Sequence, residues 1–288
     1  MNLHAFYKRC LALNLRPATI AQYRKVLLRF VKEGNDDNST SEQIRSYLAS
    51  LQVSPATRKI HWMTLNVYFN FLHRNNLIDI NPMKAVEKPK VPKKIMRYFS
   101  SQEVKQMIDC WDTKTYSGIR NKTIMLLFLG TGIRRAELAG LLLKDVRWDM
   151  DCIIIRGKGG KERTVPLSSE LRRVISTYIS FRNHWMDGHD ACNALFLSAN
   201  YRQPMTPAGI WSVFKRSPLT GERISPHTWR HTFGRCWILN GGSLVALQQI
   251  MGHSDISTTR KYIFLASEDV GIENERYNPL SNGRWQYY

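Results

Sequence analysis

Several side chains in the second half of this sequence could together attack a phosphodiester bond. Tyr262 offers a phenolic nucleophile, and basic and histidine residues precede it at intervals. Arginine forks bind non-bridging phosphate oxygens in pairs, and the charge that they neutralise grows towards the transition state. The residues that could surround the phenol are Arg134, Lys158, His227, Arg230 and His253. Such a set predicts DNA cleavage through a covalent protein link, which conserves the bond energy for rejoining.

The charge of the chain points to a polyanionic partner. Lys and Arg number 42 against 23 Asp and Glu, which gives a net charge of +19 and a pI near 9.9. The first 97 residues alone hold 17 basic and 6 acidic side chains, a net +11. Such an excess favours nucleic acid first and an anionic membrane second. A merely soluble basic protein is the alternative, and it explains this concentration of charge poorly.

The residues that could do chemistry follow a helical N-terminal domain, predicted over residues 1–80. Its apolar residues recur every three or four positions, as in amphipathic helices. Ser54-Pro55 is a start signal, because serine caps a helix and proline suits its first turn. The aromatic residues that follow are expected in the core of a small bundle. The expected helices span about residues 3–13, 20–31, 41–51 and 55–75.

Residues 81–97 are predicted to form an extended basic linker between two domains. Proline alternates there with lysine and few apolar residues, and proline stiffens such a chain. A solvated hinge is one interpretation. We favour a tether that lies along phosphates while the domains close around a duplex. The lysines expected to contact DNA in it are Lys88, Lys90, Lys93 and Lys94.

Residues 98–266 are predicted to form a second domain of helices and one β-hairpin. Ser100 and Glu103 have the spacing of a capping box at a helix start. Segments 152–156 and 162–166 are strand-like and flank a Gly-Lys-Gly-Gly-Lys turn. The other expected helices span about residues 119–129, 134–142, 168–181, 207–214, 226–239, 243–251 and 255–265.

Cysteine and histidine spacing argue against disulfides and metal. The five cysteines are scattered, and none forms a Cys-x-x-Cys pair or lies at zinc-ligand spacing from a histidine. We therefore expect reduced thiols, no metal and no cofactor. The N-terminus lacks the apolar core of a signal peptide, and the best apolar run covers only residues 124–129. The expected location is the cytoplasm, without a membrane partner.

Four motifs follow one another in the second domain. They are Thr-Gly-Ile-Arg-Arg-Ala-Glu-Leu (131–138), Gly-Lys-Gly-Gly-Lys-Glu-Arg (157–163), Ser-Pro-His-Thr-Trp-Arg-His-Thr-Phe (225–233) and Met-Gly-His-Ser-Asp-Ile-Ser-Thr-Thr-Arg-Lys-Tyr (251–262). In this order they resemble the motifs of the tyrosine recombinases, which include phage integrases, Xer-type resolvases and transposon-encoded relatives. Each motif alone is weak, whereas the ordered set is specific and covers most of the domain.

The resemblance implies a fold and an activity. The fold would be mainly α with a small antiparallel β-sheet, as a two-domain C-shaped DNA clamp with a SAM-like helical core-binding domain. The activity would be site-specific recombination of double-stranded DNA through a 3′-phosphotyrosyl intermediate and a Holliday junction, in integration, excision or resolution. A homotetramer would pair two sites without ATP or metal. Accessory DNA-bending or directionality factors would set the direction.

The resemblance also implies roles for single residues. Tyr262 would be the nucleophile, and Arg134 and Arg230 would clamp the non-bridging oxygens. His227 is the best candidate for accepting the tyrosine proton, and His253 would bond to the phosphate. Because phenol ionises near pH 10, Tyr262 needs cationic neighbours or a base.

Further residues would support this set. Lys158, at the hairpin tip, would protonate the leaving 5′-oxygen, although Lys161 is not excluded from that role. Lys161 and Arg163 are candidates for phosphate contact. Glu137 follows Arg134 by three residues and is expected to orient it. His231 is interpreted as a structural histidine.

Two departures from the family pattern and three rival functions stay open at this stage. Trp229 and the pair Ile263-Phe264 are interpreted as changes in packing. The tail, residues 267–288, is acidic and then aromatic, and by resemblance it would dock on a neighbouring protomer. The rivals are a type IB topoisomerase-like enzyme, a catalytically silent DNA-binding regulator of the same fold and, more distantly, an RNA-binding protein.

Overall fold

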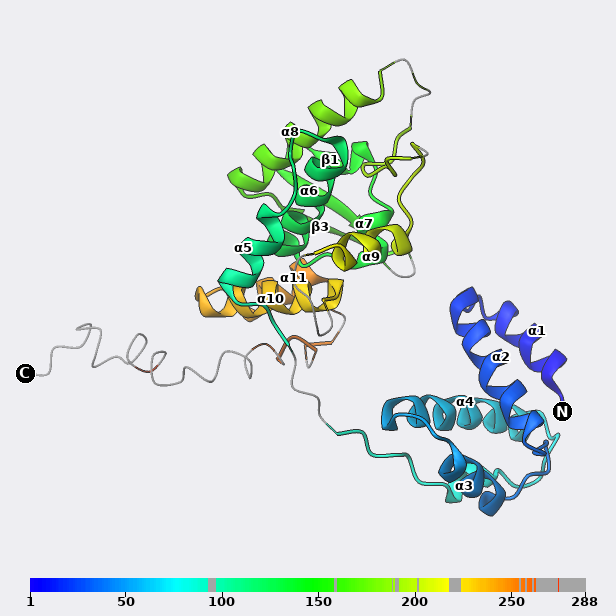
Figure 1. Cartoon of the computed structure of the whole chain (residues 1–288). Coiled ribbons are helices and arrows are strands. Elements are labelled where there is room, and N and C mark those ends of the chain that lie inside the picture. The colour runs from blue at the N-terminus through cyan, green and yellow to red at the C-terminus, as the bar shows by residue number, and fades with distance from the viewer. Residues whose placement is uncertain are drawn as a thin grey trace, which may run out of the picture. The chain divides into compact units, whose positions relative to one another are not determined.

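The chain divides into two compact units, Met1–Lys94 and Ile95–Tyr288 (Figure 1). The computed structural model describes residues 1–92, 97–157, 160–187, 189, 192–200, 202–217, 224–253, 255–256, 258–260, 262 and 274. Lys93, Lys94, Lys158 and the pair Ile263-Phe264 lie outside this set, as do most of the tail and part of the expected helix 255–265.

The N-terminal unit is a bundle of four helices. They are α1 (Leu3–Ala12), α2 (Pro17–Lys32), α3 (Ser41–Ser50) and α4 (Pro55–Arg74). The side chains of Tyr68 and Phe69 on α4 are fully buried, and Phe6 on α1 meets the Tyr68 ring edge-on at 5.1 Å between centroids. The aromatic residues of this helix therefore form the core, as the sequence predicts.

Local capping explains where two of these helices begin. The Thr40 side chain accepts a hydrogen bond from the Gln43 backbone while Gln43 bonds back to Thr40, which satisfies two otherwise unpaired N–H groups at the start of α3. Ser54 accepts a hydrogen bond from the Thr57 backbone, directly before Pro55. The start signal recognised in the sequence is confirmed.

The first part of the expected linker belongs to this unit instead. Pro82–Ala85 forms a short 3₁₀ helix, η1, in which Met83 is buried. The Trp62 indole on α4 donates to the Val86 carbonyl at 2.9 Å. Because proline and lysine dominate this segment, the sequence did not indicate that two apolar side chains, Met83 and Val86, dock on the bundle. Extended chain begins only after Val86.

The C-terminal unit surrounds a small sheet with helices. The helices are α5 (Ser101–Asp109), α6 (Tyr116–Thr131), α7 (Arg135–Ala139), α8 (Ser169–Trp185), α9 (Pro207–Lys215), α10 (Pro226–Leu239) and α11 (Leu244–Met251), with a 3₁₀ turn η2 at Leu143–Asp145. Strands β2 (Cys152–Arg156) and β3 (Glu162–Pro166) form the predicted antiparallel hairpin, with Ile153 opposite Val165. A third, two-residue strand, β1 (Val146–Arg147), pairs with β2 and was not predicted.

The core of the C-terminal unit lies around α6, which packs against both α8 and α10 (Figure 1). Trp229 on α10 is fully buried and packs on Phe99 and Phe214, so the departure at this position is a change in packing. The mainly helical fold with a small antiparallel sheet is thus confirmed. None of the described helices is long and apolar enough to cross a membrane.

One glycine sets the path of the chain into the site. Gly132 ends α6 with a left-handed φ of +57°, and a Cβ there would lie 2.5 Å from the Phe233 ring. Only glycine adopts this conformation at so little steric cost. The turn allows Arg134, two residues later, to take the N-cap position of α7.

Candidate active site

Arg134 is held at the N-terminus of α7 by its own capping contacts. Its backbone N–H donates to Glu137 Oε2 at 2.9 Å, and its Nη1 donates to Glu137 Oε1 at 2.8 Å. Its Nη2 donates to the Gly252 carbonyl at 3.0 Å. The structure thus places Glu137 against Arg134, as their three-residue spacing suggests. The Arg134 side chain is 39% exposed and can still meet a ligand.

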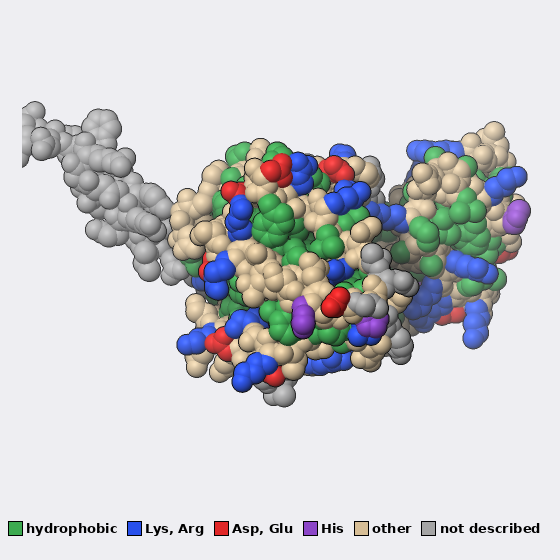
Figure 2. All heavy atoms as spheres, turned by 90° about the horizontal axis from the view of Figure 1, so that it is seen from above, with side chains coloured by type: hydrophobic (Ala, Val, Ile, Leu, Met, Phe, Trp, Pro, Cys, Tyr) green, Lys and Arg blue, Asp and Glu red, His purple; other side chains and the backbone are tan. Residues whose placement is uncertain are grey.

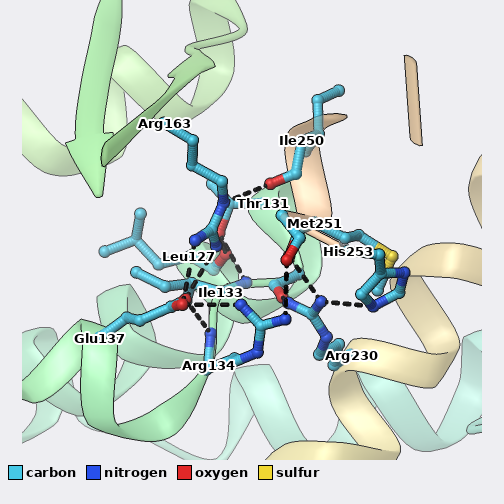
Figure 3. A network of polar contacts seen from close by, with 12 residues as sticks. Leu127, Thr131, Ile133, Arg134, Glu137, Arg163, Arg230, Ile250, Met251 and His253 are labelled. Atoms are coloured by element: carbon cyan, nitrogen blue, oxygen red, sulfur yellow. Dashed lines mark hydrogen bonds and ion pairs between the residues drawn. The ribbon is translucent and has the colours of Figure 1, made fainter. Parts of the chain in front are cut away.

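Arg230, on α10, is the buried arginine of the site. The residue is 4% exposed, and its Nη1 donates to the Gly132 carbonyl. Its Nη2 donates to the Met251 carbonyl and to His253 Nε2, both at 2.7 Å (Figure 3). Burial lowers the pKa of Arg230 to about 10, and the nearby charge of Arg134 adds to this shift. The guanidinium is therefore still charged at neutral pH, in a fixed orientation.

Arg163 faces inwards in this structure. Instead of pointing outwards to phosphate, its guanidinium forms a bidentate ion pair with Glu137, at 3.0 and 2.8 Å (Figure 3). The two side chains are only 12% and 7% exposed. Burial alone would raise the pKa of Glu137, but the hydrogen bonds from Arg163 and Arg134 outweigh it and lower that pKa. Glu137 is therefore a carboxylate shared by two arginines.

His253 lies at the end of α11 between Arg230 and Thr259. Its Nε2 accepts from Arg230, so its Nδ1 carries the proton and donates to Thr259 Oγ1 at 2.8 Å. Burial and the charges of Arg230, Arg134 and Arg163 lower the pKa of His253 to about 4. The imidazole is neutral at physiological pH.

Tyr262 lies against two histidine rings. Its hydroxyl is hydrogen-bonded to His231 Nδ1 at 3.2 Å, and its ring is nearly parallel to that of His253, 6.3 Å between centroids. A Cβ at Gly234 would come within 2.6 Å of the Tyr262 ring, so α10 approaches the phenol closely only because it carries glycine there. Tyr262 is 2% exposed.

The protonation of Tyr262 reflects two opposing effects. Burial raises the pKa of Tyr262, while the positive charges of Arg230 and Arg134 partly offset this. The phenol is protonated at neutral pH, and it needs a proton acceptor before it can attack phosphorus. The group hydrogen-bonded to it is His231, and not His227 as expected.

His227 borders a hollow of about 230 Å³ that is also lined by Arg134, Arg135, Trp211 and Arg230. Its side chain is exposed, but partial burial and the charges of Arg230, Arg135 and Arg134 lower its pKa. The hollow therefore offers three guanidiniums and a neutral imidazole to an anion.

The lysines predicted to contact DNA are exposed where the structure describes them. Lys161 follows the hairpin turn, and its carbonyl accepts from the Gly157 backbone at 2.7 Å. Lys88 lies over the Trp62 ring, 5.9 Å from its centroid, and Lys90 is exposed. Across the described residues, no three His, Cys, Asp or Glu side chains gather as metal ligands do.

Sequence reasoning missed two features of the site. One is His231 as the hydrogen-bond partner of Tyr262, although its spacing of four residues from His227 had placed it on the same helical face. The other is the use of backbone carbonyls from Gly132, Met251 and Gly252 to hold the arginines. No residue type signals a carbonyl contact, so sequence alone offers no sign of it.

Comparisons with known proteins agree with this site. Residues 97–268 match the model of the phage integrase family. Tyrosine recombinase XerD of Staphylococcus haemolyticus is 30% identical over 273 residues, covering 91% of this chain and 92% of that protein. Tyrosine recombinase XerC of Myxococcus xanthus is 32% identical over 243 residues, covering 81% of this chain and 80% of that protein.

Solved structures share the fold. The Tn1549 transposon integrase in complex with transposon right end DNA has a TM-score of 0.75 at 19% identity, covering 96% of this chain and 98% of that chain. The XerH site-specific recombinase bound to its palindromic difH substrate has a TM-score of 0.70 at 20% identity, covering 95% and 84%. These relatives and structures are recombinases and integrases, so the topoisomerase alternative is not favoured. The chain therefore belongs to the phage integrase family and is a tyrosine recombinase, an enzyme of site-specific DNA recombination.

Proposed function

We propose that Tyr262 attacks a DNA phosphodiester and forms a 3′-phosphotyrosyl link while a 5′-hydroxyl leaves. The observation that carries this proposal is the convergence of Tyr262, His231, His253, Arg230 and Arg134 from three separate segments of the chain. The scissile phosphate would occupy the hollow bordered by Arg134, Arg230 and His227. Guanidiniums already fixed there would neutralise charge on the phosphorane without reorganising.

The proton of Tyr262 would pass first to His231. A general base must lie within hydrogen-bond reach of the proton that it takes, and His231 does. His227 is the competing acceptor, because it borders the hollow and its lowered pKa keeps the ring neutral. On rejoining, the same histidine would return the proton. Neutral His253 accepts a hydrogen bond from Arg230 through Nε2 and would hold that guanidinium towards the phosphate.

A general acid must protonate the leaving 5′-oxygen. Lys158 on the β2–β3 turn is proposed for this role by its place in the family motif, with Lys161 as the alternative. No cofactor is part of the proposal, since Tyr262 and this acid supply the nucleophile and the proton.

Double-stranded DNA is the proposed substrate, and assembly is proposed to occur on it. Solved relatives include a lambda integrase dimer bound to a core site and XerH bound to difH DNA. By analogy, the two units of this chain would close around a duplex, with Lys88, Lys90 and Lys161 near phosphates. Two sites would then be paired by a tetramer, with residues 267–288 docking on a neighbour.

The test is to trap the covalent intermediate on a nicked DNA substrate from which the cut end can diffuse away. We expect a protein–DNA adduct that survives denaturation, joined to a 3′ end, and no adduct with Tyr262→Phe. Sequencing the trapped ends gives the target and the cut position. DNA binding without any adduct would overturn the proposal and favour the silent regulator.

A further inference from the structure

Three successive carbonyls at the C-terminus of α11 each accept a hydrogen bond from a different arginine (Figure 3). The pairs are Ile250 with Arg163 at 2.7 Å, Met251 with Arg230 at 2.7 Å, and Gly252 with Arg134 at 3.0 Å. The last carbonyls of a helix have no partner within it and carry partial negative charge. The end of α11 therefore holds three guanidiniums that would otherwise repel one another.

Arg163 differs from the other two arginines in what it can reach. All three of its guanidinium nitrogens donate within the protein, Nε to Ile250 and both Nη to Glu137. Its side chain is 12% exposed, against 39% for Arg134. A guanidinium so engaged is poorly placed to bind a DNA phosphate, because a phosphate would have to displace an ion pair with a buried carboxylate.

Arg163 links three elements of the site. It extends from β3, bonds to the end of α11 next to His253, and fixes the carboxylate that holds Arg134 on α7. On the basis of the proposed function, we propose that Arg163 is a positioning residue for cleavage. It holds Arg134 and His253 in the reactive arrangement through Glu137 and the α11 terminus, without contacting DNA.

The rival interpretation is the phosphate contact that the sequence suggested, and the two make opposite predictions. Removing a residue that binds phosphate weakens DNA binding and reduces the slope of log K against log salt by about one. Removing a positioning residue leaves binding intact and slows the chemical step. Misplacing catalytic groups by about 1 Å can cost roughly 100-fold in rate.

The experiment uses Arg163→Lys in the full chain, with the wild-type adduct measured first. Lysine keeps the charge but lacks the planar fork that binds a carboxylate in bidentate fashion. We expect single-turnover adduct formation at saturating DNA to fall about 10- to 100-fold, with DNA affinity within about threefold and the salt slope unchanged. Cleavage at the wild-type rate, or a reduced salt slope, would overturn the inference.

A matched control is Arg156→Lys on the neighbouring strand. Arg156 also bridges to a buried carboxylate, that of Asp145 at 2.7 Å, but it has no contact with the site. This variant should cleave within about twofold of the wild type, because the altered ion pairs, with Asp145 and Glu162, involve neither Glu137 nor the carbonyls of α11. A decrease equal to that of Arg163→Lys would indicate a general structural effect and contradict the positioning role.

A second variant and a pH profile guard against misfolding as an explanation. Glu137→Gln removes the other half of the pair, and the double variant should cleave no more than about threefold slower than the worse single variant, since both changes break one linkage. Arg163 helps to lower the pKa of Glu137. In Arg163→Lys that pKa rises, so cleavage should cease at a higher pH than in the wild type as the solution is acidified.

Failure of the proposed function is recognised separately. If the wild-type protein forms no adduct, the covalent mechanism itself is wrong. If the wild type forms the adduct and Arg163→Lys and Glu137→Gln cut as fast, only the positioning role is wrong.

Discussion

The two units treat their positive charges in opposite ways. Within residues 1–92, all of which the structure describes, no arginine is buried. In the C-terminal unit, Arg120, Arg182 and Arg230 are 3–4% exposed, and each donates to backbone carbonyls. Figure 2 shows other Lys and Arg side chains spread over the face in view.

This difference suggests that exposed charges serve DNA affinity and that buried charges serve the cleavage reaction. Exposed charges attract a polyanion from solution and are screened by salt. A buried guanidinium is costly to desolvate, but once carbonyls hold it, it does not reorganise when charge develops on a substrate. We therefore propose that Arg230 acts at the reacting centre and that Lys88 and Lys90 help to hold DNA. Four predictions test this division, beginning with the largest effect.

The division would break if a buried arginine of the site could be replaced without any effect on the chemistry. Arg230→Lys keeps a charge but cannot reach Gly132, Met251 and His253 together. We expect adduct formation to slow by about 10²–10³-fold, the cost of removing a transition-state donor. Arg120→Lys is the matched control. It should lower the unfolding free energy by about 1–3 kcal/mol and leave the rate per folded molecule unchanged.

Two histidines of α10 allow a second comparison between a partly buried contact and an exposed side chain. His231 is bonded to the Tyr262 hydroxyl, whereas His227 is exposed. Removing the general base costs about 10²-fold or more, so His231→Gln should slow adduct formation by that amount and His227→Gln by less. Single-turnover rates at several pH values decide between them. A larger decrease in His227→Gln would indicate that His227, the residue favoured by the sequence, accepts the Tyr262 proton.

A comparison of pH dependence follows from one histidine in each unit. Burial lowers the pKa of His61, which bonds to Tyr47, and lowers that of His253 to about 4. In the unfolded chain each of these histidines binds a proton with a pKa near 6.5, whereas in the folded chain it stays neutral at that pH. The contribution to stability is therefore full above pH 6.5 and declines as the pH falls. Between pH 7 and 5, His253 should account for a decrease of up to about 2 kcal/mol in the free energy of unfolding, reduced by solvent screening because the side chain is only partly buried.

Urea unfolding at pH 7 and pH 5 measures this decrease. His253→Asn should remove most of it from the C-terminal unit, and His61→Asn should flatten only the N-terminal transition. Equal pH dependence in His253→Asn and the wild type would contradict the buried, neutral state of His253.

The smallest effect is expected at exposed lysines. The double variant Lys88→Ala with Lys90→Ala should weaken DNA binding several-fold and lower the salt slope by about 0.9 for each phosphate that is no longer neutralised. Its single-turnover rate at saturating DNA should match the wild type. Fluorescence anisotropy titrations at several salt concentrations supply the slope, and a slower saturated rate would contradict a role in affinity alone.

Much of this structure can be predicted from the sequence, because the interactions that form its helices and hairpin are local. Ser54 and Ser100 cap helices within three residues, and the hairpin strands 152–156 and 162–166 pair across a short turn. Motif spacing was enough to identify the family and to pick out Arg134, Arg230, His253 and Tyr262.

The structure departs from the sequence-based expectations where the deciding neighbours are distant along the chain. Met83 joined the bundle because α3 and α4 offered it an apolar surface, and not because of its neighbours in the sequence. Arg163 turned inwards because Glu137, 26 residues away, and Ile250, 87 residues away, offered it a carboxylate and a carbonyl.

The sequence by itself determined the elements, the family and the kind of chemistry, since helix caps, hairpin pairing and motif order act over short stretches. Only the tertiary structure decided which histidine meets the Tyr262 hydroxyl and which arginine faces inwards. The physical reason is that backbone carbonyls at the ends of α6 and α11 select the guanidiniums. Every residue carries the same carbonyl group, so the sequence does not show which carbonyls will face a guanidinium after folding.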